Sequence, residues 1–128
     1  LTEVGFWADP RDPLDEQPNP AQLVDKDWGK TATALAVALY AQCGFLESFE
    51  LGYSFCRLGC GGGGNNRFMG CTTLTDGKYV WPEGLAHYVS EHSVRPPEDF
   101  VRRSLGNLRA LREAQEGGRL RWDVDDRG

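Results

Sequence analysis

One stretch of the chain decides the fold: residues 72–92, with the sequence TTLTDGKYVWPEGLAHYVSEH. Asp76 and Gly77 separate two short runs rich in Thr, Tyr, Val and Trp. Asp-Gly between such runs is typical of a two-residue hairpin turn with positive φ at both central residues. Pro82 follows, and proline is favourable at the first position of a helix because its missing N–H costs nothing there. Apolar residues then recur every three or four positions, so we expect a β-hairpin over residues 72–81 and a helix that begins at Pro82.

The only two histidines of the chain, His87 and His92, lie on or just after this expected helix. Side chains five residues apart diverge by about 140° on an ideal helix, so we expect His92 to lie on a relaxed or terminated last turn. Upstream, Cys56 and Cys60 place two thiols four residues apart at a Gly-rich turn. Zinc is usually held by four thiolates and imidazoles, and three to five residues between two histidine ligands is an accepted spacing. The pattern predicts a structural zinc site formed by Cys56, Cys60, His87 and His92.

Two other interpretations of these residues stay open. The competing ligand set is Cys56, Cys60, Cys71 and His87, which leaves His92 as a surface residue. The other interpretation has no metal: the imidazoles are ordinary half-buried side chains, and four cysteines allow two disulfides in three connectivities. A chain of 128 residues with 40% apolar content does not need a disulfide scaffold for stability. We therefore expect free thiols, as in a reducing compartment or an organelle matrix.

The charge of the chain is unevenly distributed. The formal net charge is −5: residues 1–27 hold seven acids and two bases, and residues 28–128 hold twelve of each. A neutral body without clustered Lys and Arg argues against a phosphate-binding surface, so nucleic acid is not an expected partner. No run approaches the ~20 apolar residues of a membrane helix, so we expect a soluble protein without a membrane span. The chain begins at Leu1 rather than Met, which we interpret as the removal of a targeting segment or as trimming.

The chain divides into an acidic, proline-rich arm over residues 1–27 and a single domain over residues 28–128, with a zinc module at residues 53–95. We expect the arm to be extended, with Phe6 and Trp7 lying across the domain or a partner. The first of the remaining elements is a helix from Asp27 to Cys43 with a buried final thiol and with Asp27 or Thr31 as its N-cap. The others are a strand-like run at residues 45–49, a strand-like or extended run at residues 51–55, a helix from Pro97 to Gly117, and an edge strand or anchoring arm at residues 119–124. This is a small α+β fold with a β-hairpin and two to three helices. Its cysteine knuckle, hairpin and ligand-bearing helix follow one another as in a treble clef.

Several motifs of the zinc module occur together in a known family. They are GYSFCR from Gly52, GCG from Gly59 and LTDGKYVWPEGLAHYVSEHSVRPPEDFV from Leu74 to Val101, with GFW and LVD in the leader similar as well. On these motifs the chain resembles an uncharacterised family of small, mainly bacterial hypothetical proteins. The resemblance implies a shared domain, and it brings no activity and no catalytic residues with it. The chain departs from the family pattern in the run Gly61–Gly64, in Cys71, and in Pro96-Pro97, where a single proline is usual.

Three classes of function agree with this pattern. We favour a non-enzymatic, zinc-stabilised binding module, an accessory subunit of a larger assembly with other protein subunits as partners, because four ligands close a structural zinc site. Aromatic side chains near both ends of the chain, Phe6, Trp7 and Trp122, suit anchoring on another surface. The alternative is a metal-dependent hydrolase in which only three of the ligands bind the metal and Glu83 or Glu91 is the general base. A nucleic-acid-binding zinc finger is the third class.

Overall fold

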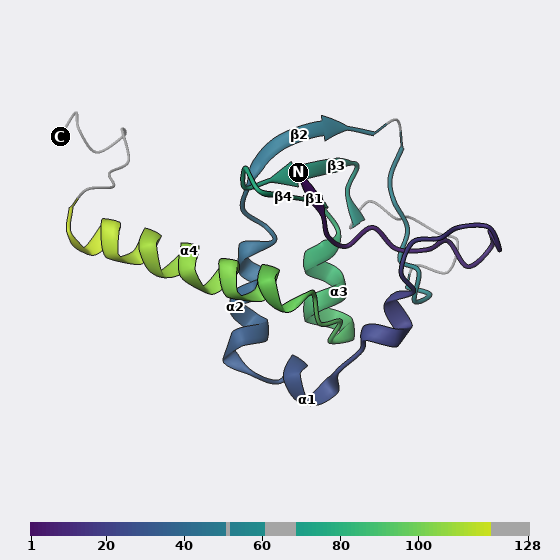
Figure 1. Ribbon diagram of the computed structural model, residues 1–128, viewed down its shortest axis with the longest axis horizontal. Helices are drawn as coiled ribbons and strands as arrows, with labels where there is room; N and C mark the ends of the chain where they lie inside the picture. The colour runs from purple at the N-terminus through teal and green to yellow at the C-terminus, as the bar shows by residue number, and fades with distance from the viewer. Residues whose placement is uncertain (51, 61–68, 119–128) are drawn as a thin grey trace.

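The computed structural model describes residues 1–50, 52–60 and 69–118. In this part of the chain a four-stranded sheet packs against α-helices, which confirms the expected α+β class. The strand order is β1-β4-β3-β2, so that β1 (Thr2–Glu3) and β2 (Phe45–Phe49) form the two edges of the sheet (Figure 1). β2 is the strand expected at residues 45–49, and residues 52–55 lead to Cys56 without forming a strand.

The central hairpin forms as the sequence predicts. β3 (Thr72–Thr75) and β4 (Tyr79–Pro82) pair antiparallel. The turn lies one residue later than predicted: Thr75 lies opposite Val80, so Gly77 and Lys78 are the central residues, and of these only Gly77 has positive φ, at 93°. The carboxylate of Asp76 instead accepts the backbone N–H groups of the two residues after Gly77, at 3.0 and 2.8 Å. This side-chain capping closes the turn without positive φ at Asp76.

The helix that carries the histidines, α3 (Leu85–His92), begins later than predicted. Pro82 is the last residue of β4, where it lies opposite Thr73, and it does not start the helix. Proline has no N–H for the strand ladder, so the end of a strand tolerates it. Gly84 precedes the helix and approaches the chain at Met69 so closely that a Cβ would lie 2.9 Å from the Met69 carbonyl oxygen. The prediction of the helix is confirmed, and its predicted start is wrong.

The expected single helix from Asp27 to Cys43 is two helices, α1 (Lys26–Gly29) and α2 (Ala32–Tyr40). The break lies at Thr31, whose backbone is extended and whose hydroxyl accepts the N–H of Ala34 at 3.2 Å as the N-cap of α2. The same hydroxyl donates to the carbonyl of Trp28 at 2.6 Å. The alternative that Thr31 is the N-cap is therefore confirmed for α2. A single helix that begins at Asp27 is wrong, because this capping ends one helix and starts the next.

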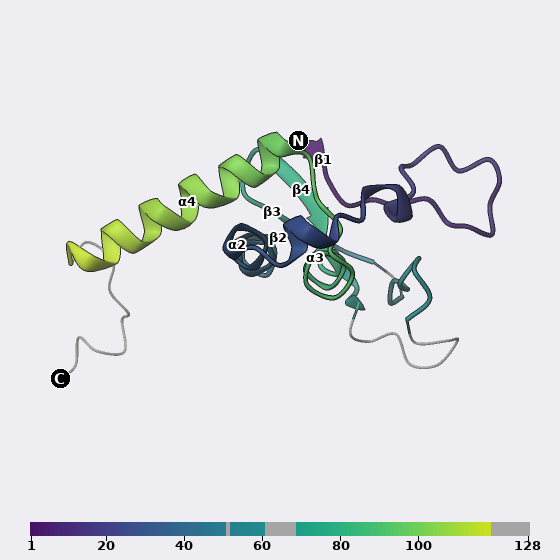
Figure 2. The same cartoon turned by 90° about the horizontal axis from the view of Figure 1, so that it is seen from below.

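The last helix, α4 (Glu98–Glu116), begins after Pro97 and ends at Gly117, as predicted. Its first turns pack against the body, and its C-terminal turns project beyond it (Figures 1 and 2). The described ranges thus hold four α-helices where two to three were expected, and the break at Thr31 accounts for the difference. None of these helices is long and apolar enough to cross a membrane.

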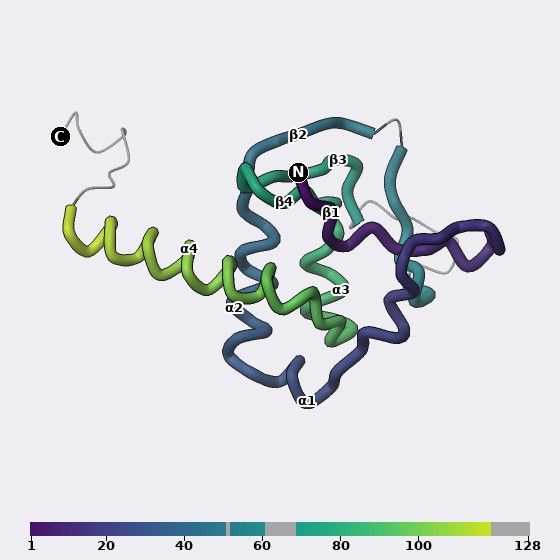
Figure 3. The backbone as a smooth tube through the Cα atoms, viewed as in Figure 1, coloured from purple at the N-terminus to yellow at the C-terminus, as the bar shows by residue number. Residues whose placement is uncertain are grey.

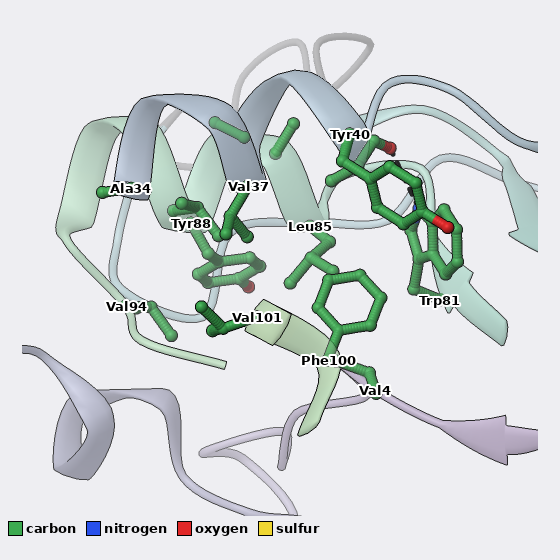
Figure 4. Packing of buried hydrophobic residues seen from close by; sticks show 14 of the residues in the cluster. Val4, Ala34, Val37, Tyr40, Trp81, Leu85, Tyr88, Val94, Phe100 and Val101 are labelled. Atoms are coloured by element: carbon green, nitrogen blue, oxygen red, sulfur yellow. Dashed lines mark hydrogen bonds between the residues drawn. The ribbon is translucent and has the colours of Figure 1, made fainter. Parts of the chain in front are cut away.

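The core lies between the sheet and the helices. Trp81 of β4 is fully buried, and its indole N–H donates to the carbonyl of Ala41 at 2.9 Å. Its ring packs edge-on against Phe100 of α4, with 5.3 Å between the ring centroids. Figure 4 shows this pair together with Tyr40 of α2 and Leu85 of α3, so that one cluster joins the sheet to three helices.

The leader contributes to this core. β1 pairs with β4 in parallel, and the buried ring of Trp7 meets Tyr88 of α3 edge-on, with 5.7 Å between centroids. The chain then forms a loop at one end of the molecule (Figure 3) and returns through the 3-10 helix η1 (Pro20–Leu23). Trp7 therefore packs on the rest of the chain, one of the two placements expected for it.

The predicted domain division stays a prediction, and the run Gly61–Gly64 and the predicted strand at residues 119–124 lie outside the described residues.

Candidate metal centre

Two segments far apart in the sequence bring four metal-ligating side chains together. The loop at residues 56–60 contributes two thiols, and α3 contributes two imidazoles. The ligand atoms of Cys56, Cys60, His87 and His92 all lie within 4.8 Å of one another. Within the described ranges, this is the group of His, Cys, Asp and Glu side chains with the geometry to hold a metal ion.

The Nε2 atom of His92 lies at the centre of the group. It is 3.1 Å from the Sγ of Cys60, 3.4 Å from the Sγ of Cys56 and 3.2 Å from the Nε2 of His87. One imidazole nitrogen has a single proton or a single lone pair, so it cannot form three hydrogen bonds at once. Tetrahedral zinc, with Zn–S of about 2.3 Å and Zn–N of about 2.0–2.1 Å, separates its ligand atoms by roughly 3.4–3.8 Å. The three separations from the Nε2 of His92 lie at or below this range, and the other ligand atoms lie up to 4.8 Å apart, so a small shift of the side chains would arrange all four around one small cation.

The end of α3 gives His92 its position. Helical geometry stops at His92, and Ser93 takes a left-handed conformation with φ of 55°. The two imidazole rings can therefore meet across five residues, with 4.9 Å between their centroids. The prediction that His92 lies on a terminated last turn is confirmed.

The cysteine loop is fastened to α3 by a residue that lies between the two histidines. The hydroxyl of Tyr88 accepts the backbone N–H of Arg57 at 2.7 Å and donates to the carbonyl of Phe55 at 3.4 Å. The two bonds lie on either side of Cys56, so Tyr88 fixes the position of the cysteine loop relative to α3. The three- and four-residue apolar spacing of this helix predicts only a core position for Tyr88, and its place between the two histidines is the sequence signal of this second contact.

The loop itself is a tight turn. The N–H of Gly59 donates to the carbonyl of Cys56 at 3.1 Å, and Gly59 has a positive φ of 95° that favours glycine. This turn brings Cys60 back toward Cys56. Cys56 is buried and Cys60 is partly exposed, so the group lies at the surface of the molecule with one ligand inside it.

The surroundings of His87 and Cys60 favour the neutral forms of these two side chains when no cation is bound. Burial lowers the pKa of His87, and the neighbouring His92 acts in the same direction. Burial raises the pKa of the Cys60 thiol, and the proximity of Cys56 and Glu91 adds to this. A metal ion requires neutral imidazoles and deprotonated thiols, and its positive charge would compensate for the cost of placing two thiolates side by side.

Comparison with known protein families identifies the family of the domain that contains these four residues. A family model described as a domain of unknown function, DUF7919, matches residues 1–105. The chain belongs to the DUF7919 family. The matched range contains all four residues of the metal-ligating group, and it supports the expectation of an uncharacterised family. No curated protein and no solved structure matches the chain.

The third candidate thiol of this DUF7919 domain, Cys71, is not part of the group. Its N–H donates to the carboxylate of Glu83 at 3.3 Å, and its carbonyl accepts the N–H of Glu50 at 2.6 Å. Glu83 also accepts the hydroxyl of Thr72 at 2.7 Å. Cys71 and Glu83 therefore join the start of the hairpin to the chain around it, and Glu83 is already engaged there.

The fourth thiol lies elsewhere on the surface. Cys43 is exposed, and its thiol lies 3.4 Å from the carbonyl of Leu39. The expectation that Cys43 is a buried apolar residue is wrong, because α2 ends at Tyr40 and Cys43 follows outside the helix. All four cysteines are free thiols in the DUF7919 domain, and no disulfide joins them.

Proposed function

We propose that this chain is a non-enzymatic, zinc-stabilised binding domain in which Cys56, Cys60, His87 and His92 hold one Zn²⁺. The observation that carries the proposal is the convergence of three ligand atoms on the Nε2 of His92, which hydrogen bonding cannot satisfy. Two thiolates and two imidazoles are a donor set that suits zinc. The order of cysteine loop, hairpin and histidine-bearing helix supports a treble-clef-like module at residues 53–95.

A structural role follows from the number and placement of the ligands. Four protein ligands fill a tetrahedral shell and leave no position for a substrate water. They also join a loop without regular secondary structure to α3, which the core holds in place. Metal binding at such a junction contributes to the folding free energy of the module.

A hydrolytic role has less support. Glu83, one of the two candidate general bases, is engaged by Thr72 and Cys71 on the hairpin. Glu91 is the candidate that acts electrostatically on Cys60 and His87. A catalytic site would therefore depend on Glu91 and on the loss of one ligand in favour of water.

A binding role is supported by the surface of the domain. Several large apolar side chains of α2 and β2 are at least half exposed, among them Leu35, Phe45 and Phe49. Exposed apolar side chains that gather in one region mark interaction sites in soluble domains. We therefore propose that the zinc site holds a small scaffold together and that the scaffold acts by binding another protein surface, as an accessory subunit does.

Metal analysis with thiol counting tests the zinc assignment. The native full chain, purified without chelator, is expected to hold one zinc per chain and to leave Cys43 and Cys71 reactive while Cys56 and Cys60 are protected. His92→Ala and Cys60→Ser should each lower zinc occupancy, whereas the matched variants Cys43→Ser and Cys71→Ser should retain one zinc. A metal-free native chain, or zinc loss on Cys71→Ser equal to that on Cys60→Ser, would contradict the proposal.

A further inference from the structure

The turn directly after His92 has an unfavourable backbone conformation. Ser93 has φ of 55° and ψ of 31°, and it is the residue other than glycine that has positive φ within the described ranges. This left-handed conformation is strained for a residue with a Cβ atom. Such strain persists only where the surrounding structure holds it. Because His92 precedes Ser93 in the chain, the contacts that hold Ser93 also determine where this proposed zinc ligand lies.

The segment before α1 holds the backbone of this turn. The N–H of Asp25 donates to the carbonyl of Ser93 at 2.9 Å. The N–H of Arg95 donates to the carbonyl of Leu23, also at 2.9 Å. Asp25 is at the same time the N-cap of α1, so that α1 begins directly beside the turn.

The last residue of α1, Gly29, lies against the side chain of Ser93. A Cβ atom at position 29 would lie 2.1 Å from the Oγ, 2.4 Å from the Cβ and 3.1 Å from the Cα of Ser93. Real Cβ atoms essentially never approach another heavy atom within 3.0 Å. Gly29 is helical and does not have positive φ, so the position needs glycine for space and not for its conformational freedom.

A change of rotamer cannot make room for a side chain at position 29. Rotation about the Cα–Cβ bond of Ser93 moves the Oγ and leaves the Cβ where it is, so the backbone of the turn has to move. His92 and Ser93 also line a hollow of about 430 Å³, which gives the turn space to move without loss of the fold. Metal sites tolerate deviations of only about 0.2 Å in their ligand distances, so such a movement affects His92 as a ligand.

We propose that Gly29 is a positioning residue of the zinc centre: its missing side chain lets α1 lie against Ser93, and this contact holds the turn that places His92 among the other ligands. The inference rests on the proposed function, because it explains the position of one of the proposed ligands. It makes α1 and the segment before it part of the metal centre, although they supply no ligand. A side chain at position 29 should therefore weaken metal binding before it affects the rest of the fold.

Competition for zinc between the full chain and a chromophoric chelator tests this role. Gly29→Ala should raise the zinc Kd by about 10-fold or more, as replacement of residues that orient metal ligands does. Alanine favours a helix more than glycine does, so the loss of affinity would come from the contact with Ser93 and not from α1 itself. Gly106→Ala is the matched control, because a Cβ at Gly106 of α4 would meet no atom within 4 Å, and it should leave the Kd unchanged.

A second substitution tests whether the effect passes through Ser93. Ser93→Gly removes both the Oγ and the Cβ that approach position 29, and glycine adopts positive φ readily. Ser93→Gly alone should keep the native Kd, and Gly29→Ala with Ser93→Gly should regain most of the lost affinity. Cobalt(II) in place of zinc gives a spectroscopic readout: the visible bands of a tetrahedral site should weaken or shift in Gly29→Ala and return in the double variant. Circular dichroism of the same samples shows whether each chain is folded.

The outcomes separate this inference from the proposed function. A native chain that binds one zinc with a Kd that Gly29→Ala leaves unchanged would overturn the positioning role and leave the zinc centre standing. A Gly29→Ala chain that is less stable but keeps the native Kd and cobalt spectrum would show a merely structural contact and would overturn it too. A Gly29→Ala chain that does not fold, or an affinity that Ser93→Gly does not restore, would do the same. A native chain that binds no zinc would contradict the proposed function, and the positioning role with it.

Discussion

At the scale of single residues, Tyr88 shows how one side chain serves both the core and the metal centre. Its ring is buried against Trp7, and its hydroxyl binds the backbone on both sides of Cys56. Burial raises the pKa of Tyr88 to about 12, so the hydroxyl stays protonated and can donate throughout the physiological range. The loop that carries two of the proposed ligands is thus held by neutral hydrogen bonds that do not change with pH.

Tyr88→Phe should therefore loosen the cysteine loop without removing a ligand. The partly buried N–H of Arg57 would lose its acceptor, and such a loss costs about 1–2 kcal/mol. Urea denaturation of the zinc-loaded chain should show this decrease in the free energy of unfolding, with one zinc per chain retained. Tyr53→Phe removes the hydroxyl of an exposed tyrosine and serves as the control. An unchanged stability of Tyr88→Phe would show that the hydroxyl does not hold the loop.

At the scale of elements, the hairpin turn is fastened to two helices by one carboxylate. Asp76 accepts hydrogen bonds from Tyr40 of α2 and from Arg103 of α4, the latter at 2.7 Å. Asn107 of α4 donates to Tyr40 at 2.8 Å and closes the network. Burial would raise the pKa of Asp76, but the hydrogen bonds from Tyr40, the turn backbone and Arg103 outweigh it and hold the pKa at about 2, below the ordinary 3.8.

Asp76→Asn should lower the free energy of unfolding by about 1–2 kcal/mol at neutral pH, because the ion pair and charge-assisted bonds are lost. A carboxyl whose pKa is lowered on folding stabilises the fold above its unfolded pKa, and this contribution is lost as the pH falls toward the folded pKa. The difference between native chain and variant should therefore be constant above about pH 4 and shrink between pH 4 and pH 2. Measuring the difference cancels the titration of the metal ligands, which both chains share. A difference independent of pH over that range would contradict the assignment.

At the scale of the whole molecule, the sequence predicted the features that local chemistry determines. The hairpin, the helix with both histidines and α4 follow from turn residues, periodicity and a terminal proline and glycine. The spacing of two cysteines near a turn and two histidines on one helix also predicts the candidate ligands, but it leaves open both the set with Cys71 in place of His92 and an interpretation without metal. Two details depended on how strands pair and were not predicted. They are the place of Pro82 in a strand and the pairing of β1 with β4.

The pairing of the leader is the clearest case of such a long-range contact. A two-residue strand has no periodicity to detect, and a proline-rich acidic segment is usually irregular. The position of the leader is evident only from the folded chain, in which the ring of Trp7 packs against Tyr88. The leader therefore contributes to stability through burial rather than through its own secondary structure.

Trp7→Ala should lower the free energy of unfolding by about 3 kcal/mol or more, because it removes a buried ring from the core. Leu14→Ala, in the exposed loop of the same leader, should change it by less than about 0.5 kcal/mol. Thermal or urea unfolding of both variants gives the comparison. Equal effects of the two substitutions would show that the leader is not part of the folded core.

X-ray absorption at the zinc edge of the native full chain tests the proposed zinc centre most directly. A zinc ion bound by the four proposed ligands should show two sulfur ligands at about 2.3 Å and two nitrogen ligands at about 2.0–2.1 Å. A shell of three sulfurs would mean that Cys71 replaces a histidine, and a shell with an oxygen ligand would mean an open, catalytic site. Either shell, or a native chain without zinc, would contradict the assignment of Cys56, Cys60, His87 and His92.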